Sequence, residues 1–143
     1  MSLRLSHTTI WVLDQDSAKE FYTEKLGFEV RQDFTMGDAF EGAGAGIRWL
    51  TVGPVDQPDV QLILADCGMG HDPTATEMIR ELVAKGALGS GVLSTEDCHA
   101  AYEELSSRGV VFLEEPAERP YGIEAVLRDD SGNWFSLTQP FAG

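Results

Sequence analysis

The chain has 143 residues, of which 43% are hydrophobic and 24% are charged, a composition typical of one globular domain and not of a disordered chain. Twenty-four acidic residues against ten basic ones give a net charge of −14, which disfavours nucleic acid and anionic membranes as partners. This charge would favour a cationic small ligand, but a well-solvated surface is the simpler interpretation and the one that we prefer. No apolar run approaches the roughly 20 residues that cross a membrane and no charged leader precedes an apolar core, so we expect a soluble, cytoplasmic protein.

The first predicted elements are a strand over residues 5–12 and a helix that ends at Gly27. Alternation gives the strand two faces, one of which carries His7, Thr9 and Trp11. Asp14, Asp16 and Ser17 offer N-cap oxygens, and Ser17 with Glu20 has the spacing of a capping box. Gly27 suits the left-handed position that closes a helix.

Three more strands are predicted over residues 28–33, 47–52 and 60–65, and Gln61 and Ile63 share one face of the last. The glycine-rich passage 35–46 predicts a flap or a long hairpin and not a phosphate-binding loop, because a strand-like segment follows it where a helix would be needed. A helix over residues 74–85 then follows, with Thr74 and Glu77 as a capping box.

The second half repeats this order. A strand over residues 90–95 and an acidic turn lead into a helix that stops at Gly109. Three strands follow over 110–114, 123–128 and 134–139, and DDSGN predicts a tight hairpin turn between the last two. A repeated unit of this kind must bury itself against its neighbour. We therefore predict one domain over residues 1–143, made of module one (4–66), a linker helix (73–86) and module two (88–140).

Four segments match a known family: the H-x-x-x-x-V-x-D run at 7–14, FYTEKLGF at 21–28, TEDCHAAYEELSSRGV at 95–110 and DDSGNWFSL at 129–137. Over nearly the whole chain this pattern resembles the vicinal oxygen chelate superfamily, which contains glyoxalase I, bleomycin- and fosfomycin-resistance proteins and extradiol dioxygenases. The resemblance implies an α+β fold in which two tandem βαβββ modules form a cup of curled mixed sheet, with the helices outside and the ligand inside. Because proteins with such a fold catalyse unrelated reactions, the function must be inferred from the residues that line the cup.

In metal-using members four strand positions lining the cup carry His or Glu, and the resemblance places them at His7, Gln61, Ser90 and Ser136. Serine hydroxyls neither balance the charge of a divalent cation nor displace its water well. We therefore expect no bound metal and no cofactor. The alternative is a divalent metal at His7 and Gln61 in a glyoxalase-like lyase or isomerase or a dioxygenase, so whether the protein is an enzyme stays open.

The sequence gives little support to nucleophilic or general-base catalysis. No serine or cysteine has a base at a recognisable spacing, and His7 has no evident oxyanion stabiliser beside it as a general base. We predict that His71 and His99 lie on the surface, and that Cys67 and Cys98 are free thiols, because they are far from any C-x-x-C spacing.

Aromatic walls with scattered neutral hydrogen-bonding groups suit a flat organic ligand, which stacks on rings and is oriented by a few polar contacts. The predicted ligand-binding residues are His7, Thr9, Trp11, Arg48, Gln61, Ile63, Ser90, Trp134 and Ser136. Trp49 replaces Arg48 if the strand parity is shifted, Val92 and Thr138 lie beside this set, and Tyr121 is predicted at the rim.

The resulting prediction is a metal-free protein, similar to the bleomycin-resistance branch, that binds a small and aromatic ligand. Related small members usually dimerise, so the resemblance also implies a homodimer whose cup can combine the first module of one chain with the second of its partner. An interaction domain with a filled cup is a third possibility.

Overall fold

The computed structural model describes residues 1–36 and 46–141 of the chain. Its first half contains β1 (His7–Val12), α1 (Gln15–Glu20), the π-helix η1 (Phe21–Lys25), β2 (Glu29–Met36), β3 (Ile47–Gly53) and β4 (Gln61–Asp66). Its second half follows α2 (Pro73–Ala84) and contains β5 (Gly89–Ser94), α3 (Cys98–Ser107), β6 (Val111–Arg119), β7 (Gly122–Arg128) and β8 (Trp134–Pro140). The predicted flap falls mostly on residues 37–45, outside the described residues.

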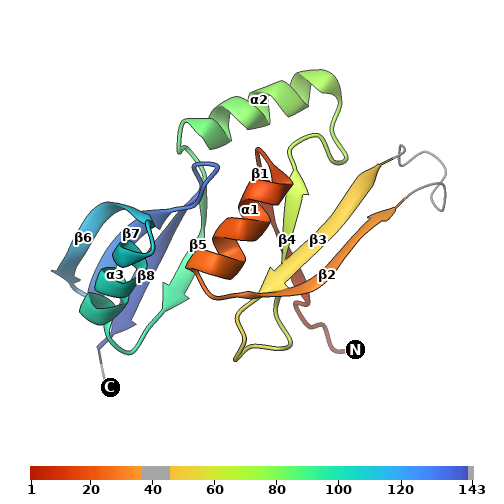
Figure 1. Ribbon diagram of the computed structural model, residues 1–143. Coiled ribbons are helices and arrows are strands. Elements are labelled where there is room, and N and C mark those ends of the chain that lie inside the picture. Colours follow the sequence, from red (N-terminus) through yellow and green to blue (C-terminus); the bar gives the residue numbers. More distant parts are fainter. Residues whose placement is uncertain (37–45, 142–143) are drawn as a thin grey trace.

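The two halves have the same topology, which confirms the predicted pair of βαβββ modules. Module one forms a four-stranded sheet in the order β1-β4-β3-β2, and module two forms one in the order β5-β8-β7-β6. In each sheet the first and last strands of the module pair in parallel and the other neighbours are antiparallel. Within the single chain the two sheets stay open and do not close together into one barrel (Figure 1).

All three α-helices of the described chain begin at an aspartate. The side chains of Asp14, Asp72 and Asp97 accept hydrogen bonds from the backbone N–H groups three residues later. The expected capping boxes at Ser17 and Thr74 are therefore wrong, because an aspartate just upstream satisfies the free amides of the first turn. The predicted glycine stop is confirmed at Gly27, which has a φ of 76°.

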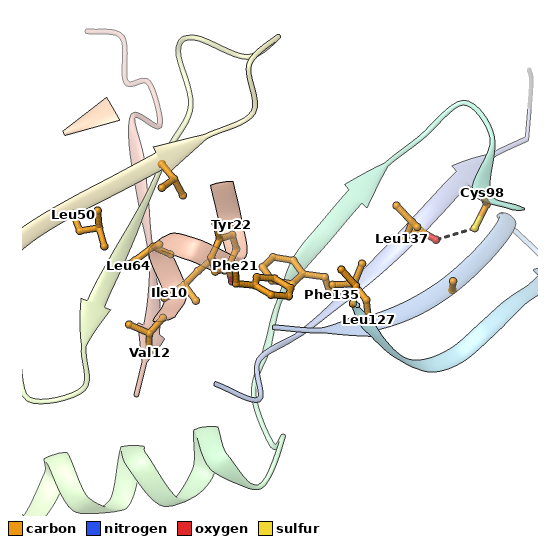
Figure 2. Packing of buried hydrophobic residues seen from close by; sticks show 14 residues of the cluster. Ile10, Val12, Phe21, Tyr22, Leu50, Leu64, Cys98, Leu127, Phe135 and Leu137 are labelled. Atoms are coloured by element: carbon orange, nitrogen blue, oxygen red, sulfur yellow. Dashed lines mark hydrogen bonds between the residues drawn. The ribbon is translucent and has the colours of Figure 1, made fainter. Parts of the chain in front are cut away.

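A single apolar core joins the two modules. It contains the helix-side residues of both sheets, including Ile10 and Leu64 from module one and Leu127 and Phe135 from module two. The first helix lies between the sheets, while α3 packs on β6, β7 and β8 (Figure 1). Figure 2 shows the aromatic rings of Phe21 and Tyr22, both in η1, on the side of module one that faces Phe135, whose ring centroid is 6.2 Å from that of Tyr22.

Two strands are longer than predicted. β6 continues from the predicted end near Glu114 to Arg119, because irregularities in register at Glu114 allow its pairing with β7 to resume at Ala117. β2 likewise extends to Met36. In the described part of the chain, none of the helices combines the length and the hydropathy needed to span a bilayer.

Candidate functional site

Each sheet has one face without a helix, and most of the predicted ligand-binding residues lie on these two helix-free faces. The opposite faces both contribute to the shared core, so the helix-free faces turn away from that core and from each other. Because side chains alternate along a strand, each one can be assigned either to the core face or to the helix-free face. In module one, Ile10 and Leu64 point to the core, and their neighbours point to the helix-free face.

The module-one face brings together four of the predicted ligand residues. His7 is directly paired with Gln61, and Thr9 with Ile63, across the parallel strands β1 and β4. Polar contacts orient the amide of Gln61, whose Oε1 accepts a 2.8 Å hydrogen bond from the Thr51 hydroxyl. The face therefore combines an imidazole with neutral hydrogen-bonding groups, as expected from the sequence.

Trp49 supplies the aromatic wall of this face. Its ring centroid is 5.9 Å from that of His7, and its Nε1 donates a 2.9 Å hydrogen bond to Gln32 Oε1. Phe34 is paired with Trp49 on the edge strand β2 and is 48% exposed. Neither Gln32 nor Phe34 was identified from the sequence, because the glycine-rich segment obscured the register between β2 and β3.

Arg48 points to the opposite, helix-covered face, so it does not join the ligand residues. Its Nε donates a 2.8 Å hydrogen bond to Asp33 Oδ1, and its Nη1 donates a 2.6 Å bond to Asp16 Oδ1. Lys19 donates to the other oxygen of Asp33. Of the two alternatives, Trp49 and not Arg48 therefore lies on the helix-free face. The ion pairs of Arg48 hold the first helix against β2 and β3.

Trp11 lies at the far end of the module-one face, where its ring packs against that of His71 with centroids 4.6 Å apart and the two planes tilted by 53°. His71 was predicted on the surface, but it is half-buried, and its Nδ1 donates a 2.8 Å hydrogen bond to the carbonyl oxygen of Cys67. The Trp11–His71 contact therefore occupies this end of the face.

On the module-two face, Ser136 and Thr138 lie beside Val92 and Ser94 of β5. Ser90 falls at a bulge, because Gly89 pairs with Trp134 and Gly91 with the next residue of β8. Trp134 lies over Gly89, where a Cβ atom would come within 2.6 Å of its ring. The glycine therefore makes room for the indole, and Val92, at 71% exposed, is an uncovered apolar side chain beside it.

Glu124 is a functional candidate that sequence reasoning missed. It is paired with Thr138 across β7 and β8, and its carboxylate accepts hydrogen bonds from Ser136 Oγ (2.5 Å) and from the Tyr121 hydroxyl (2.6 Å). These bonds, that of Ser136 first, lower the pKa of Glu124. Its alternation with Ala125 and Leu127 was the available signal, since both point to the core.

The donor set does not fit a resident divalent metal. Gln61 Oε1 and Ser136 Oγ are already engaged with protein partners, and Ser90 lies at the bulge. Among the described residues no group of three His, Cys, Asp or Glu side chains could hold a metal ion. Chemically, the arrangement offers ring stacking and hydrogen bonding.

Comparison with known proteins places this geometry in a family. The model of the Glyoxalase/Bleomycin resistance protein/Dioxygenase superfamily matches residues 4–137. The uncharacterized protein YurT of Bacillus subtilis (strain 168) is 34% identical over 138 residues, which is 96% of this chain and 99% of that protein.

Solved structures extend the comparison. The crystal structure of UcmS2 has a TM-score of 0.87 and 56% identity, covering 96% of this chain and 98% of that one. The structure of TnmS3, described as an antibiotic binding protein from Streptomyces sp. CB03234, has a TM-score of 0.72 and 31% identity, covering 98% of each chain.

Proposed function

The chain belongs to the Glyoxalase/Bleomycin resistance protein/Dioxygenase superfamily, and on that basis we propose that it binds and sequesters a small aromatic ligand of the antibiotic class without a resident metal. The observation that carries this proposal is that each helix-free face combines an indole ring with neutral hydrogen-bonding groups. Trp49 shares the module-one face with Gln32 and Gln61, and Trp134 shares the module-two face with Ser136. Sequestration requires no reacting group, only stacking and orientation. The antibiotic binding described for TnmS3 supports the ligand class.

We further propose that the binding cup is shared between two copies of the chain. Within one chain the helix-free faces turn apart, so neither encloses a ligand alone. A two-fold dimer can set the module-one face of one copy against the module-two face of the other, and symmetry forms this cup twice. The exposed Val92 and Phe34 would then be covered. Each chain acts in this proposal as one domain over residues 1–143, in the cytoplasm.

The dimer is tested by light scattering at micromolar protein concentration. We expect twice the chain mass of 15.6 kDa. A molecular mass equal to one chain would contradict the shared cup.

Ligand binding is tested by quenching of tryptophan fluorescence and by thermal shift, using bleomycin and a panel of bicyclic and tricyclic aromatic compounds. We expect at least one compound to bind and raise the melting temperature. Trp49→Leu and Trp134→Leu should each weaken its affinity about five- to tenfold, since an aromatic contact contributes about 1 kcal/mol beyond its buried area.

The matched control is Tyr102→Leu, which removes an aromatic ring from α3, on the helix-covered side of module two, where it packs edge-on against Phe112. This variant should lose stability but keep the affinity. Equal losses of affinity in Tyr102→Leu and Trp134→Leu, or no binding by any compound in the panel, would contradict the proposed function.

A further inference from the structure

A continuous hydrogen-bonded group lies on the module-two face, and we call its residues Tyr121, Glu124, Ser136 and Thr138 the Glu124 centre. Tyr121 donates to Glu124 Oε1 over 2.6 Å and Ser136 Oγ donates to Oε2 over 2.5 Å, while Ser136 and Thr138 hydroxyls are 2.7 Å apart. The carboxylate side chain is only 17% exposed. Neighbouring strands thus hold one partly buried charge in a defined position.

The direction of these hydrogen bonds follows from the ionisation of Glu124. Its pKa is lowered by the Ser136 hydrogen bond and then by that of Tyr121, so the group is an anion at neutral pH and can only accept. Tyr121 and Ser136 each use their single hydrogen on it. Ser136 can then only accept from Thr138, whose hydroxyl must donate to it.

Every hydroxyl hydrogen of the centre is therefore used within it: those of Tyr121 and Ser136 are donated to Glu124, and that of Thr138 is donated to Ser136. The outer side presents the lone pairs of Tyr121, Thr138 and the carboxylate, and no donor. Arg119 does not cancel the negative charge of the centre. Its Nε is 3.9 Å from Glu124 Oε1, and its guanidinium is also 3.8 Å from Glu114. One cation between two carboxylates leaves a net negative charge.

An open hollow of about 460 Å³ lies at the ends of β5 and β8, and the residues that line it are Ser94, Thr95, Glu96, Gln139, Pro140 and Phe141. It reaches the centre through one strand pair, because Ser94 is the partner of Thr138 across β5 and β8. Glu96 lies on the wall of the same hollow and adds a second negative charge. Donor groups, and cationic ones above all, match these surroundings.

We propose that the Glu124 centre selects, among aromatic ligands of the shared cup, those that carry a hydrogen-bond donor, with a protonated amine preferred over an alcohol and a carboxylate rejected. This inference rests on the proposed function, since it presupposes that aromatic ligands bind. It assigns to one defined group of residues a preference for cationic ligands that the net charge indicates only for the chain as a whole.

The test uses three probes that share one ring system and differ in one substituent: 2-naphthylmethylamine, which is protonated at pH 7, 2-naphthalenemethanol and 2-naphthoate. Their dissociation constants are measured by tryptophan quenching. In the unmodified protein we expect the amine to bind about tenfold more tightly than the alcohol, since a charge-assisted hydrogen bond is about twice as strong as a neutral one, and the carboxylate to bind most weakly.

Glu124→Gln keeps the shape of the side chain but removes its charge and introduces an N–H donor. The three affinities should then lie within about threefold of one another, with the affinity for the alcohol nearly unchanged. The matched control is Glu118→Gln, which removes the same charge from β6 on the helix side, where Glu118 pairs with the core-packed Ile123. It should keep the order of the unmodified protein.

Tyr121→Phe provides a second variant at an exposed position, in case Glu124→Gln is not folded by circular dichroism. Loss of the phenol frees a lone pair on Glu124 Oε1, so the preference for the amine over the alcohol should increase. Three results would each overturn the inference without touching the proposed function. They are an unchanged order of the three affinities in Glu124→Gln, affinities that become nearly equal in Glu118→Gln as well, and an unchanged preference for the amine over the alcohol in Tyr121→Phe. Failure of all three probes to bind the unmodified protein would also overturn the inference, and it would reject the proposed function only if the wider aromatic panel failed to bind as well.

Discussion

The hydroxyl of Tyr22 donates a 2.7 Å hydrogen bond to Asp129 Oδ2, and this buried contact joins the first helix region of module one to the β7–β8 turn of module two. The other oxygen of Asp129 accepts from the three backbone amides of residues 131–133, each at 2.9 Å. Asn133 Nδ2 donates to the carbonyl oxygen of Trp11. The tight turn predicted by the DDSGN sequence is thus also the link that fixes the two modules to each other.

Tyr22→Phe should lower the free energy of unfolding by about 1–2 kcal/mol, because a buried carboxylate loses one of its hydrogen-bond donors. Chemical denaturation at pH 7 measures the change. Tyr102→Phe is the control, since its hydroxyl has no hydrogen-bond partner among the described residues and its loss should change stability by less than about 0.5 kcal/mol. Equal effects of the two substitutions would contradict a special role for the Tyr22–Asp129 contact.

The stability of the protein should depend on Asp33 at acidic pH. The hydrogen bonds of Arg48, and then of Lys19, hold the pKa of Asp33 well below its usual range. A carboxyl group whose pKa falls on folding stabilises the folded state above its unfolded pKa of about 3.9 and loses that contribution as the pH falls further.

Asp33→Asn should therefore reduce the free energy of unfolding by about 1 kcal/mol at pH 7, a figure that allows for partial solvent exposure, and by progressively less below about pH 4. Urea titrations at pH 7, 4 and 3 measure the difference. The control Asp59→Asn breaks only an exposed 3.6 Å ion pair with Arg4 and should have no measurable effect. A constant difference across this pH range would contradict the assignment.

Gly89→Ala should weaken aromatic ligand binding through Trp134. The new Cβ atom would lie 2.6 Å from the indole, so the ring must move. We expect a shift in tryptophan emission and a loss of affinity of about fivefold, comparable to one aromatic contact. In a Trp134→Leu background the same substitution should have little further effect on affinity, and additive losses would show that Gly89 acts in another way.

Purified protein should contain far less than one equivalent of Zn, Ni, Mn or Fe, because two serines and one amide are poor donors for a divalent cation. Elemental analysis measures this directly. If a stoichiometric metal were found and lost in His7→Ala, the metal-dependent enzyme would replace sequestration as the preferred function. His99→Ala, on α3, is the control for loss of an imidazole elsewhere.

The residues that share a face of each strand, and the order of the elements in each module, could be predicted from the sequence. Both depend on the pattern of residues that are close together in the chain. Alternation placed His7 with Gln61 and Trp134 with Ser136 on faces opposite the apolar residues, and the structure has the same parity. The glycine at position 27 and the turn before β8 were likewise predicted from conformational preferences of single residues.

Other features depend on contacts between distant residues. Arg48 forms hydrogen bonds with Asp33 and Asp16, which lie 15 and 32 positions away in the sequence. Its side chain therefore lies on the helix-covered face and not, as predicted from the sequence, among the ligand-binding residues. Glu124 became a site candidate only because the β7–β8 register brings it to Ser136, and His71 only because a loop returns to Trp11.

The sequence by itself determined the two repeated modules and the relative faces within each strand, since a period of two residues is a local property of the chain. Only the tertiary structure decided which absolute face Arg48 takes, which side chains gather around Glu124, and that the two helix-free faces turn apart. The physical reason is that register and packing direction are set by hydrogen bonds and burial between segments far apart in sequence, which no local pattern encodes.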